Sequence, residues 1–415
     1  MPDHARGALW EKARSVLCVR LDALGDVLMS GPAMRALASA PTRRRITLLT
    51  SSAGCAAGSL LGCVDDVLWY EAPWVSPGSG APDGPSHDAL VAELRRRDFD
   101  AAVIFTVYSQ SPLPAALTCC LADIPLRLAH CRENPYGLLT DWVPEPEPED
   151  GVRHEVRRQL DLVGAVGART EDEHLRLDLP QGARASVGRL LERLGLSAGR
   201  RWAVVHPGSR APSRRYPAEA YAAACRRLVE HHAITPVFTA DEDEAELIDQ
   251  IRGELTGESH SLAGRLDLGE LAALLVAAPV LVAGNSGPIH VAAAVGTPVV
   301  DLYALTNPQH GPWGVPSTVL FRDVPCRWCY RSVCPEGHHR CLRGVPPEEV
   351  ADAAAAFVDQ RQRSPGAAGD PLAVWRRAPG RARAAVGRAT PSSRRRAARS
   401  PDDADERRVA GSAHG

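Results

Sequence analysis

The sequence has no hydrophobic run long enough to span a bilayer, and its first 21 residues lack the continuous apolar core of a secretory signal. We therefore expect neither a membrane span nor export. Aromatic residues make up only 5% of the 415 residues, so the core must consist largely of Leu, Val and Ala. Eleven cysteines are too few for a disulfide scaffold in so long a chain. These absences predict a cytoplasmic enzyme of two domains.

Charge is distributed unevenly along the chain. The net formal charge is −2, but residues 363–415 contribute +7, which leaves −9 on the preceding residues. An acidic body argues against a nucleic-acid-binding surface, which would need a basic face. From Arg363 onward Arg, Ala, Pro, Gly and Ser dominate. Residues 363–415 are therefore predicted to form a disordered tail, with binding of its arginines to a membrane surface or to nucleic acid as the alternative.

Short apolar segments of strand length alternate with longer helical segments on both sides of the Pro- and Glu-rich stretch 143–156, which we expect to be an extended connector. This alternation predicts parallel sheets covered by helices. We expect strands at Ser15–Leu21, Arg45–Thr50, 64–70, 100–108, Trp202–His206, Thr235–Thr239, Val280–Ala283 and 298–304. Because the rhythm appears twice, we predict an α/β fold of two Rossmann-like domains facing a central cleft, formed by residues 14–195 and 196–362.

The turn after the first predicted strand contains Leu-Gly-Asp-Val at positions 24–27. Gly25 allows a tight backbone turn, and Asp26 falls at or near the N-terminus of the next helix. The Asp26 carboxylate has two interpretations, a helix cap or a general base that takes the proton from an attacking hydroxyl. Asp22, four residues earlier, is a helper or a rival for the second role.

Two features in the second half follow predicted strands. In the loop after Trp202–His206, Ser209 and backbone amides can donate hydrogen bonds, and Arg215 with its neighbouring arginines offers bidentate contacts to phosphate. The alternative is a set of solvated arginines. The acidic run Asp241–Glu244 is typical either of a ribose-binding position or, more commonly, of a solvated helix start.

The segment 284–288 (Gly-Asn-Ser-Gly-Pro) precedes a helix of small residues. Pro288 suits the first turn of a helix, and the free amides there, with the helix dipole, are able to hold a diphosphate. An ordinary tight turn between a strand and a helix is the alternative.

Four cysteines form the pattern C-x2-C-x4-C-x6-C within sixteen residues, at Cys326, Cys329, Cys334 and Cys341. Four thiolates can hold a structural zinc ion or an iron–sulfur cluster, and His338 or His339 can replace one of them. The spacing does not decide between the two metals, and free or transiently paired thiols are the alternative.

Together these segments resemble glycosyltransferase family 9, the ADP-heptose:lipopolysaccharide heptosyltransferases and their relatives. The similarity covers residues 14–360 and runs through VLCVRLDALGDVLMSGPAMRAL, VVHPGSRAPSRRYPAEAYAAACRRL, TADEDEAELIDQI, SLAGRLDLGELAALLVAAPVLVAGNSGPIHVAAAVGTPVVDLY and the cysteine segment ending in CLRGVPPEEV. The resemblance implies a GT-B fold and the inverting transfer of a sugar from a nucleotide-sugar, typically ADP-heptose, to a hydroxyl of an acceptor glycan. It implies that catalysis requires no metal or other cofactor.

The resemblance also assigns roles to individual residues. Residues 14–195 correspond to the acceptor-side domain, and residues 196–362 correspond to the domain that binds the nucleotide-sugar. Asp26 corresponds to the proposed catalytic base, with Asp22 and Gly25 on the acceptor side. The donor-binding positions are Ser209, Arg215, Glu244, Asn285, Ser286, Gly287 and His290. Arg215 stands where relatives usually have lysine, and Asn285 stands where many have aspartate, which leaves the identity of the donor open.

Two other classes of function remain open at this point. One is a GT-B nucleotide-sugar epimerase or hydrolase that needs no acceptor, and the other is a non-catalytic binding protein organised by the cysteine cluster. The transferase interpretation predicts a nucleotide-sugar and a glycan or glycolipid as partners, in lipopolysaccharide or cell-surface glycan biosynthesis. It further predicts a cytoplasmic monomer with peripheral contact to the inner membrane face and no nucleic-acid partner.

Overall fold

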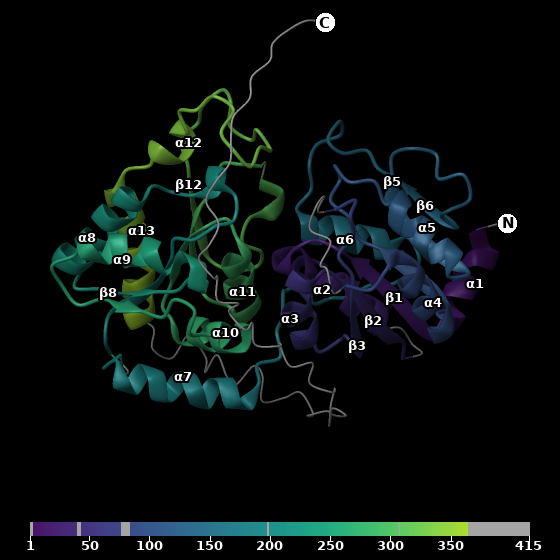
Figure 1. The fold of residues 1–415 in the computed structure, drawn as a ribbon, viewed down its shortest axis with the longest axis horizontal. Helices are drawn as coiled ribbons and strands as arrows, with labels where there is room; N and C mark the ends of the chain where they lie inside the picture. Colours follow the sequence, from purple (N-terminus) through teal and green to yellow (C-terminus); the bar gives the residue numbers. More distant parts are fainter. Residues whose placement is uncertain (1–2, 40–42, 76–83, 197–198, 307, 364–415) are drawn as a thin grey trace, which may run out of the picture.

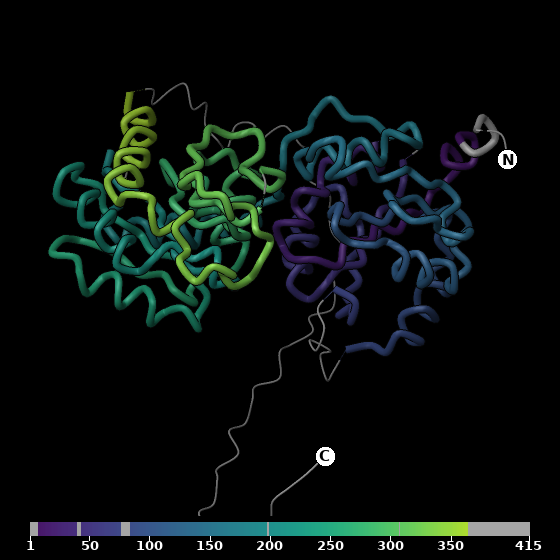
Figure 2. The backbone as a smooth tube through the Cα atoms, turned by 90° about the horizontal axis from the view of Figure 1, so that it is seen from above, coloured from purple at the N-terminus to yellow at the C-terminus, as the bar shows by residue number. Residues whose placement is uncertain are grey.

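A computed structural model describes residues 3–39, 43–75, 84–196, 199–306 and 308–363. Except for Arg363, the tail predicted at 363–415 lies outside these residues. None of the helices in the described ranges combines the length and the apolar character needed to cross a membrane. The chain forms two lobes that lie side by side, each built around one parallel sheet (Figures 1 and 2).

The first lobe holds a six-stranded sheet in the order β3-β2-β1-β4-β5-β6. Its strands are β1 (Ser15–Arg20), β2 (Arg45–Thr50), β3 (Asp66–Trp69), β4 (Ala101–Ile104), β5 (Leu126–Cys131) and β6 (Asp141–Pro144). Its helices are α1 (Asp3–Lys12), α2 (Leu24–Ala38), α3 (Ser52–Leu60), α4 (His87–Arg97), α5 (Leu113–Leu121) and α6 (Glu155–Gly164). Every neighbouring pair of strands is parallel, as the buried apolar runs of the sequence predict.

The second lobe repeats the pattern with a six-stranded sheet in the order β12-β11-β10-β7-β8-β9. Its strands are β7 (Trp202–His206), β8 (Thr235–Phe238), β9 (His260–Ser261), β10 (Leu281–Gly284), β11 (Val299–Leu302) and β12 (Ser317–Leu320). Its helices are α8 (Ala218–His232), α9 (Ala245–Gly253), α10 (Leu268–Ala277), α11 (Gly287–Val295), α12 (Arg340–Arg343) and α13 (Pro347–Arg363). The prediction of two doubly wound α/β units is confirmed, and strand order reverses between β1 and β4 and between β7 and β10.

The helices α2 and α11 pack against each other where the lobes meet (Figure 1). One apolar cluster extends from β1 through Val27 and Leu28 of α2 to Ile289 and Val291 of α11 and on to β7. The lobes therefore share a core at this point, and the N-termini of both helices lie close to the interface between the lobes.

The Pro- and Glu-rich stretch 143–156, expected to be an extended connector, begins within a strand and ends within a helix. Val143 and Pro144 end the edge strand β6, and Glu155 begins α6. Between them Glu147 is only 1% exposed and pairs with Arg153. The helix α7 (Gln181–Arg193) lies within the predicted residues 14–195 but packs against α10 of the second lobe. The domain boundary near residue 195 stays a prediction.

Candidate active site

Asp26 lies in the first turn of α2, directly after the carboxyl end of β1. One of its oxygens accepts a hydrogen bond from the backbone N–H of Ala23 at 3.2 Å, and the other accepts one from Arg20 at 3.0 Å. The first contact satisfies a free amide at the helix start, as a capping carboxylate does. The Asp26 side chain nevertheless keeps 21% of its surface exposed. Capping and contact with a ligand are therefore compatible at this residue.

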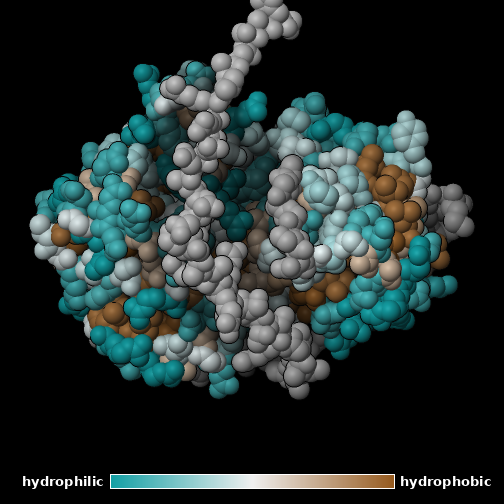
Figure 3. Space-filling view, in the orientation of Figure 1, coloured by the Kyte–Doolittle hydropathy of each residue, from teal (hydrophilic) through white to brown (hydrophobic). Residues whose placement is uncertain are grey.

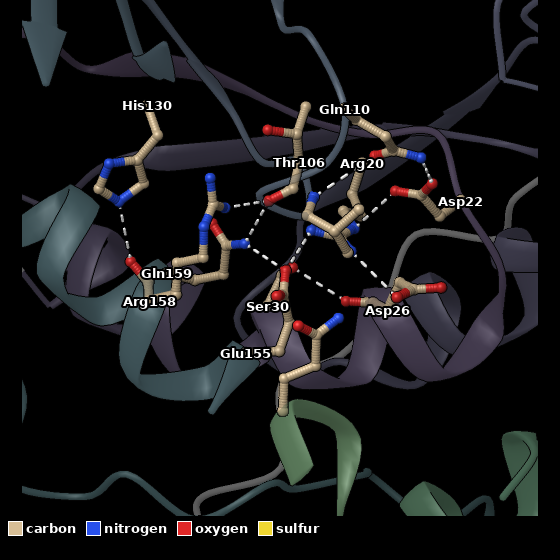
Figure 4. Close-up of polar contacts among 12 residues, drawn as sticks. Arg20, Asp22, Asp26, Ser30, Thr106, Gln110, His130, Glu155, Arg158 and Gln159 are labelled. Atoms are coloured by element: carbon tan, nitrogen blue, oxygen red, sulfur yellow. Dashed lines mark hydrogen bonds and ion pairs between the residues drawn. The ribbon is translucent and has the colours of Figure 1, made fainter. Parts of the chain in front are cut away.

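The Arg20 guanidinium gathers three carboxylates around it (Figure 4). Arg20 is fully buried at the end of β1 and pairs with Asp22 at 2.9 Å, Asp26 at 3.0 Å and Glu155 at 2.9 Å. Glu155 comes from the start of α6, and the Gln159 amide donates to it at 2.6 Å. The rigid fork of donors on an arginine suits this arrangement. Because one cation faces three carboxylates, the cluster carries an excess of negative charge.

The pKa values of Asp26 and Asp22 move in opposite directions. Burial favours the neutral form of both carboxyls. At Asp26 the charge of Arg20 outweighs burial and the pKa is lowered. At Asp22 burial outweighs Arg20, the neighbouring charge of Asp26 adds repulsion, and the pKa is raised. Asp26 is therefore the more readily ionised of the two.

His290 of α11 approaches α2 from the second lobe and lies against Gly25. An added Cβ at Gly25 would come within 2.5 Å of His290 Cδ2, so glycine permits this approach. His290 is 4% exposed, and its burial lowers its pKa to about 3. Among the described residues, its Nδ1 has no hydrogen-bond partner. A neutral imidazole with an unused nitrogen thus lies at the contact between the lobes, near Asp26.

His310 is the second histidine of the second lobe that influences Asp26, and it lies in the turn Pro308–His310. Burial lowers the pKa of His310, while Glu155 and Asp26 oppose this effect. The carboxylates of the first lobe that influence His310 therefore come from the starts of both α2 and α6.

His154 links the lobes through the N-terminus of α6. Its Nδ1 accepts from the backbone N–H of Val156 at 3.2 Å, and its Nε2 lies 2.9 Å from the carbonyl oxygen of Gly311. These contacts require the neutral tautomer protonated at Nε2. The ring also packs on Trp313 with centroids 4.4 Å apart. Burial lowers the pKa of His154 to about 4, which agrees with that tautomer.

Three of the predicted donor-binding residues lie together beyond the end of β7. The Arg215 guanidinium donates to the carbonyl oxygen of Ser209 at 2.7 Å. Glu244 reaches so close to Gly208 that an added Cβ would lie 1.8 Å from its Oε2. Burial raises the pKa of Glu244, Asp241 adds to the rise, and Arg215 opposes it. Glu244 is thus half-buried against the loop rather than part of a fully solvated helix start.

Asn285 is 2% exposed, and both donors of its amide have protein partners. The amide lies 3.2 Å from Asp301 Oδ2 and 2.9 Å from the carbonyl oxygen of His310. The backbone oxygen of Asn285 accepts from Arg214 at 3.3 Å. Burial raises the pKa of Asp301 to about 7. In this arrangement Asn285 supports the turn around it, and direct contact with the donor stays a prediction.

Ser286 is the N-cap of α11, and Pro288 lies in the first turn as predicted. The Ser286 hydroxyl donates to the carbonyl oxygen of Gly284 at 3.2 Å instead of capping the helix. A Cβ at Gly287 would lie 3.3 Å from Leu24 Cδ2. The N-terminus of α11 therefore opens toward the start of α2. In the space-filling view, hydrophilic side chains gather in the recess between the lobes where it is uncovered (Figure 3).

Several residues of the site escaped the sequence analysis. Arg20 is a charged residue at the end of the apolar run VLCVR, and a charge at the end of a buried strand is the one local pattern that indicates a functional residue here. Glu155, His154 and His310 carry no local motif, because the fold alone brings them to Asp26. Arg214 was recognised only as one of several arginines, yet it contacts the Asn285 turn directly.

The four cysteines of the predicted metal site line one small cavity together with His338 and His339. Cys326 Sγ lies 3.6 Å from His338 Nε2, and all four thiols are unpaired by disulfides. Nevertheless, no three His, Cys, Asp or Glu side chains in the described part of the chain converge closely enough to hold a metal ion. As placed, the thiols do not form a metal centre, and the metal site stays a prediction.

The cysteine segment has a second contact of interest, with the loop that carries Arg214 and Arg215. The Ser213 hydroxyl donates to the carbonyl oxygen of Arg331 at 2.6 Å, and His339 Nε2 lies 2.6 Å from the carbonyl oxygen of Ser213. The cysteine segment therefore packs against the loop that carries Arg214 and Arg215 and holds it through Ser213.

Comparison with known proteins identifies the class. The sequence profile of "Glycosyltransferase family 9 (heptosyltransferase)" matches residues 88–339, and the chain belongs to this family. It is a glycosyltransferase, which leaves the epimerase or hydrolase and the non-catalytic binding protein without support. Lipopolysaccharide heptosyltransferase 2 of Escherichia coli is 25% identical over 354 residues, covering 82% of this chain and 97% of that protein. The Salmonella typhimurium protein of the same name is 26% identical, covering 79% and 94%.

Solved structures confirm the fold. The family 9 glycosyltransferase of Veillonella parvula superposes with a TM-score of 0.68 at 19% identity, covering 84% of this chain and 97% of that chain. The Escherichia coli ADP-heptose lps heptosyltransferase II superposes with a TM-score of 0.65 at 22% identity, covering 84% and 99%. The GT-B fold expected from the resemblance is therefore present.

Proposed function

We propose that this glycosyltransferase moves a heptose from ADP-heptose to a hydroxyl of a lipopolysaccharide-core or related cell-surface glycan, with inversion at the anomeric carbon and without a catalytic metal. The names of the Escherichia coli relatives support the sugar and the pathway. The observation that carries the proposal is the position of Asp26, an ionised carboxylate at the start of α2 next to Gly25, against which His290 of the other lobe packs.

In the proposed reaction, Asp26 accepts the proton of the acceptor hydroxyl while that oxygen attacks the anomeric carbon from the face opposite the nucleotide. The bond to the diphosphate breaks, and the leaving group gains negative charge. Arg215, Ser209 and the amides at the start of α11 would stabilise that charge, with Glu244 on the ribose and His290 beside the diphosphate. Cations and helix amides of this kind can replace a divalent ion at the leaving group.

The remaining proposals concern the setting of the reaction. A glycolipid acceptor would bring the protein to the inner face of the membrane, where it would act as a cytoplasmic monomer in peripheral contact with lipid. The two helix N-termini at the lobe interface would close on the donor and exclude water, which otherwise competes as an acceptor.

The direct test is transfer by the purified chain from ADP-heptose to a truncated core glycolipid, followed by mass spectrometry and by NMR of the new anomeric centre. We expect inversion and full activity in the presence of a chelator. Asp26→Asn should lower kcat by about 100- to 10,000-fold and leave the affinity for ADP-heptose nearly unchanged.

Glu155→Gln is the matched control, because it also removes one carboxylate from Arg20 but lies at the start of α6 and has no proposed role in the transfer. A general structural effect of losing a partner of Arg20 would lower activity equally in both variants. Retention of configuration, or full activity of Asp26→Asn, would overturn the proposed mechanism.

A further inference from the structure

Asp301 is a buried carboxyl group that the proposed mechanism does not use. It lies on β11, an interior strand of the second sheet, and is fully buried. Its Oδ2 accepts from the Asn285 amide at 3.2 Å, while its Oδ1 has no hydrogen-bond partner within the described ranges. Burial of a carboxyl group with one neutral donor costs free energy, so an apolar residue would serve the packing of β11 better. This observation points to a role beyond packing.

The partner of Asp301 is an amide group with two hydrogen bonds. The Asn285 nitrogen donates to Asp301 Oδ2 and, at 2.9 Å, to the carbonyl oxygen of His310. Both bonds would be lost if the amide turned over, because its oxygen cannot donate. Since a carboxylate accepts and does not donate, Asp301 fixes the orientation in which the amide also holds His310.

The main chain at His310 belongs to a turn that both lobes hold. The turn spans Pro308–His310. Asn285 of the second lobe donates to the carbonyl oxygen of His310. His154 Nε2 of the first lobe lies 2.9 Å from the next carbonyl oxygen, that of Gly311. Two consecutive carbonyl groups therefore connect the lobes through one amide and one imidazole.

Trp313 follows this turn and adds two contacts to the first half of the chain. Its ring packs on His154 with centroids 4.4 Å apart, and its Nε1 donates to the carbonyl oxygen of Glu173 at 2.8 Å. The carbonyl oxygens of the residues on either side of Glu173 accept from Arg35 of α2 at 2.8 Å and 2.6 Å. The turn and Trp313 thus fix the second lobe relative to α6 and to α2, the helix that carries Asp26.

The N-terminus of α11 is anchored separately from this turn. Asn285 directly follows β10, whose Gly284 pairs with Leu302 of β11. Arg214 donates to the backbone oxygen of Asn285 at 3.3 Å. Because these contacts involve the main chain, loss of the side-chain bonds of Asn285 leaves the amides of α11 in place. A change at the side chain therefore separates the arrangement of the lobes from the binding of a diphosphate.

Building on the proposed function, we propose that Asp301 is a positioning residue that, through the Asn285 amide, holds the turn Pro308–His310 in place. The held turn then sets the distance between Asp26 of the first lobe and the donor on the second lobe. Asp301 itself contacts neither substrate, and its role requires a hydrogen-bond acceptor, not a negative charge. Without it the nucleotide still binds, but the acceptor hydroxyl and the anomeric carbon meet in a poorer geometry and transfer slows.

Kinetics of the full chain test this role. Asp301→Leu keeps the branched shape of the side chain without an acceptor, and should lower kcat for transfer from ADP-heptose to the truncated core glycolipid by about 10- to 100-fold. Its Kd for ADP, measured by calorimetry, should stay within about threefold of that of the parent chain. Asp301→Asn retains an acceptor oxygen and should keep kcat within about threefold. Asp301→Ala repeats the comparison without adding volume, in case the leucine variant does not fold.

Thr297→Val is the matched control, since it also removes a buried polar group beside β11. Thr297 is 2% exposed, and its hydroxyl donates to the carbonyl oxygen of Leu275 at 2.6 Å, at the opposite end of the strand from Asn285. This variant should lower the urea midpoint and leave kcat within about twofold. Equal slowing in Thr297→Val and Asp301→Leu would mean that loss of stability explains both, and would overturn the proposal. So would equal damage from Asp301→Asn and Asp301→Leu, an unchanged kcat in Asp301→Leu, or an affinity for ADP that falls as far as kcat.

A spectroscopic measurement tests the same link without any transfer. The indole N–H of Trp313 gives one resonance in the NMR spectrum of the nitrogen-labelled full chain, assigned by its absence from Trp313→Phe. Asp301→Leu should shift this resonance, because the turn that precedes Trp313 is released. Asp301→Asn and Thr297→Val should leave it in place. An unmoved resonance in Asp301→Leu would overturn the proposal.

The proposed function and the role of Asp301 fail separately. If the chain does not transfer heptose, the shift of the Trp313 resonance can still be observed. If transfer occurs but Asp301→Leu leaves both the resonance and kcat unchanged, the proposed function stands and only the role of Asp301 is wrong.

Discussion

Gly25→Ala tests the contact that brings the two lobes together at the site. The added methyl carbon would lie 2.5 Å from Cδ2 and 3.1 Å from Nε2 of His290, and that ring is 4% exposed. Overpacking of this kind costs about 1–3 kcal/mol, and replacing glycine in a helix returns about 0.5–1 kcal/mol. We therefore expect the free energy of unfolding to fall by about 0.5–2 kcal/mol. Because a displacement of about 1 Å costs about 100-fold in rate, transfer should fall by at least that factor.

Gly31→Ala is the matched control on the same helix. Its Cβ would meet only Leu61 Cδ2, at 3.3 Å, so stability should be unchanged or higher. The assay is urea denaturation of both variants alongside the transfer rate. Combining Gly25→Ala with His290→Ala should recover part of the lost stability but not the activity, since His290 itself is removed. If Gly25→Ala is as stable and active as Gly31→Ala, the lobes do not meet through this contact.

Three further predictions follow from the site and from the cysteine cluster. Arg20→Lys should lower the free energy of unfolding, measured by urea denaturation, by about 3 kcal/mol or more, because an ammonium group cannot pair with Asp22, Asp26 and Glu155 at once. An unchanged urea midpoint would contradict this prediction. When the pH falls from 7.5 to 5.5, His154 and His290 should together lower the free energy of unfolding by about 2–3 kcal/mol, because their folded pKa values of about 4 and 3 mean that the unfolded chain binds more protons. His290→Gln should reduce this loss by about 1 kcal/mol. An equally large loss in the variant would refute the role given to His290. Protein purified without air should carry either about one equivalent of zinc or, for an iron–sulfur cluster, about two to four equivalents of iron, and should lose the metal on Cys326→Ser. Metal-free protein with reactive thiols would reject the predicted metal site.

The sequence predicts the central part of the fold and little of its periphery. The strands β1, β2, β7, β8, β10 and β11 follow from apolar runs, because strands buried on both faces must be apolar throughout. The strands β5, β6, β9 and β12 were not foreseen. Three of them, β6, β9 and β12, are edge strands with partly exposed side chains, so their sequences contain polar residues. A strand of two to four residues with partly exposed side chains is too short to show the continuous apolar run that identifies a buried strand.

The same limit applies to the site. Turns that follow a strand are visible as local patterns, which is why Asp26 and the start of α11 lie where they were expected. Glu155 and Arg20 are 135 residues apart, and no local spacing predicts their contact at 2.9 Å. Predictions from motifs therefore located the residues at the ends of β1 and β10, but the charges that set the pKa of Asp26 depend on long-range packing.

The charges around Asp26 determine how much of the proposed rate enhancement comes from the base and how much comes from stabilising the leaving group. Arg20 lowers the pKa of Asp26, which keeps the base ionised, but a base with a lowered pKa accepts a proton weakly and late in the reaction. Most of the transition-state stabilisation must then come from the leaving-group side, from Arg215 and the amides of α11. The three carboxylates around Arg20 leave negative charge on the acceptor side, and the donor side offers cations and a helix N-terminus. In the proposed transfer, this distribution of charge favours the movement of negative charge from the acceptor oxygen to the departing diphosphate.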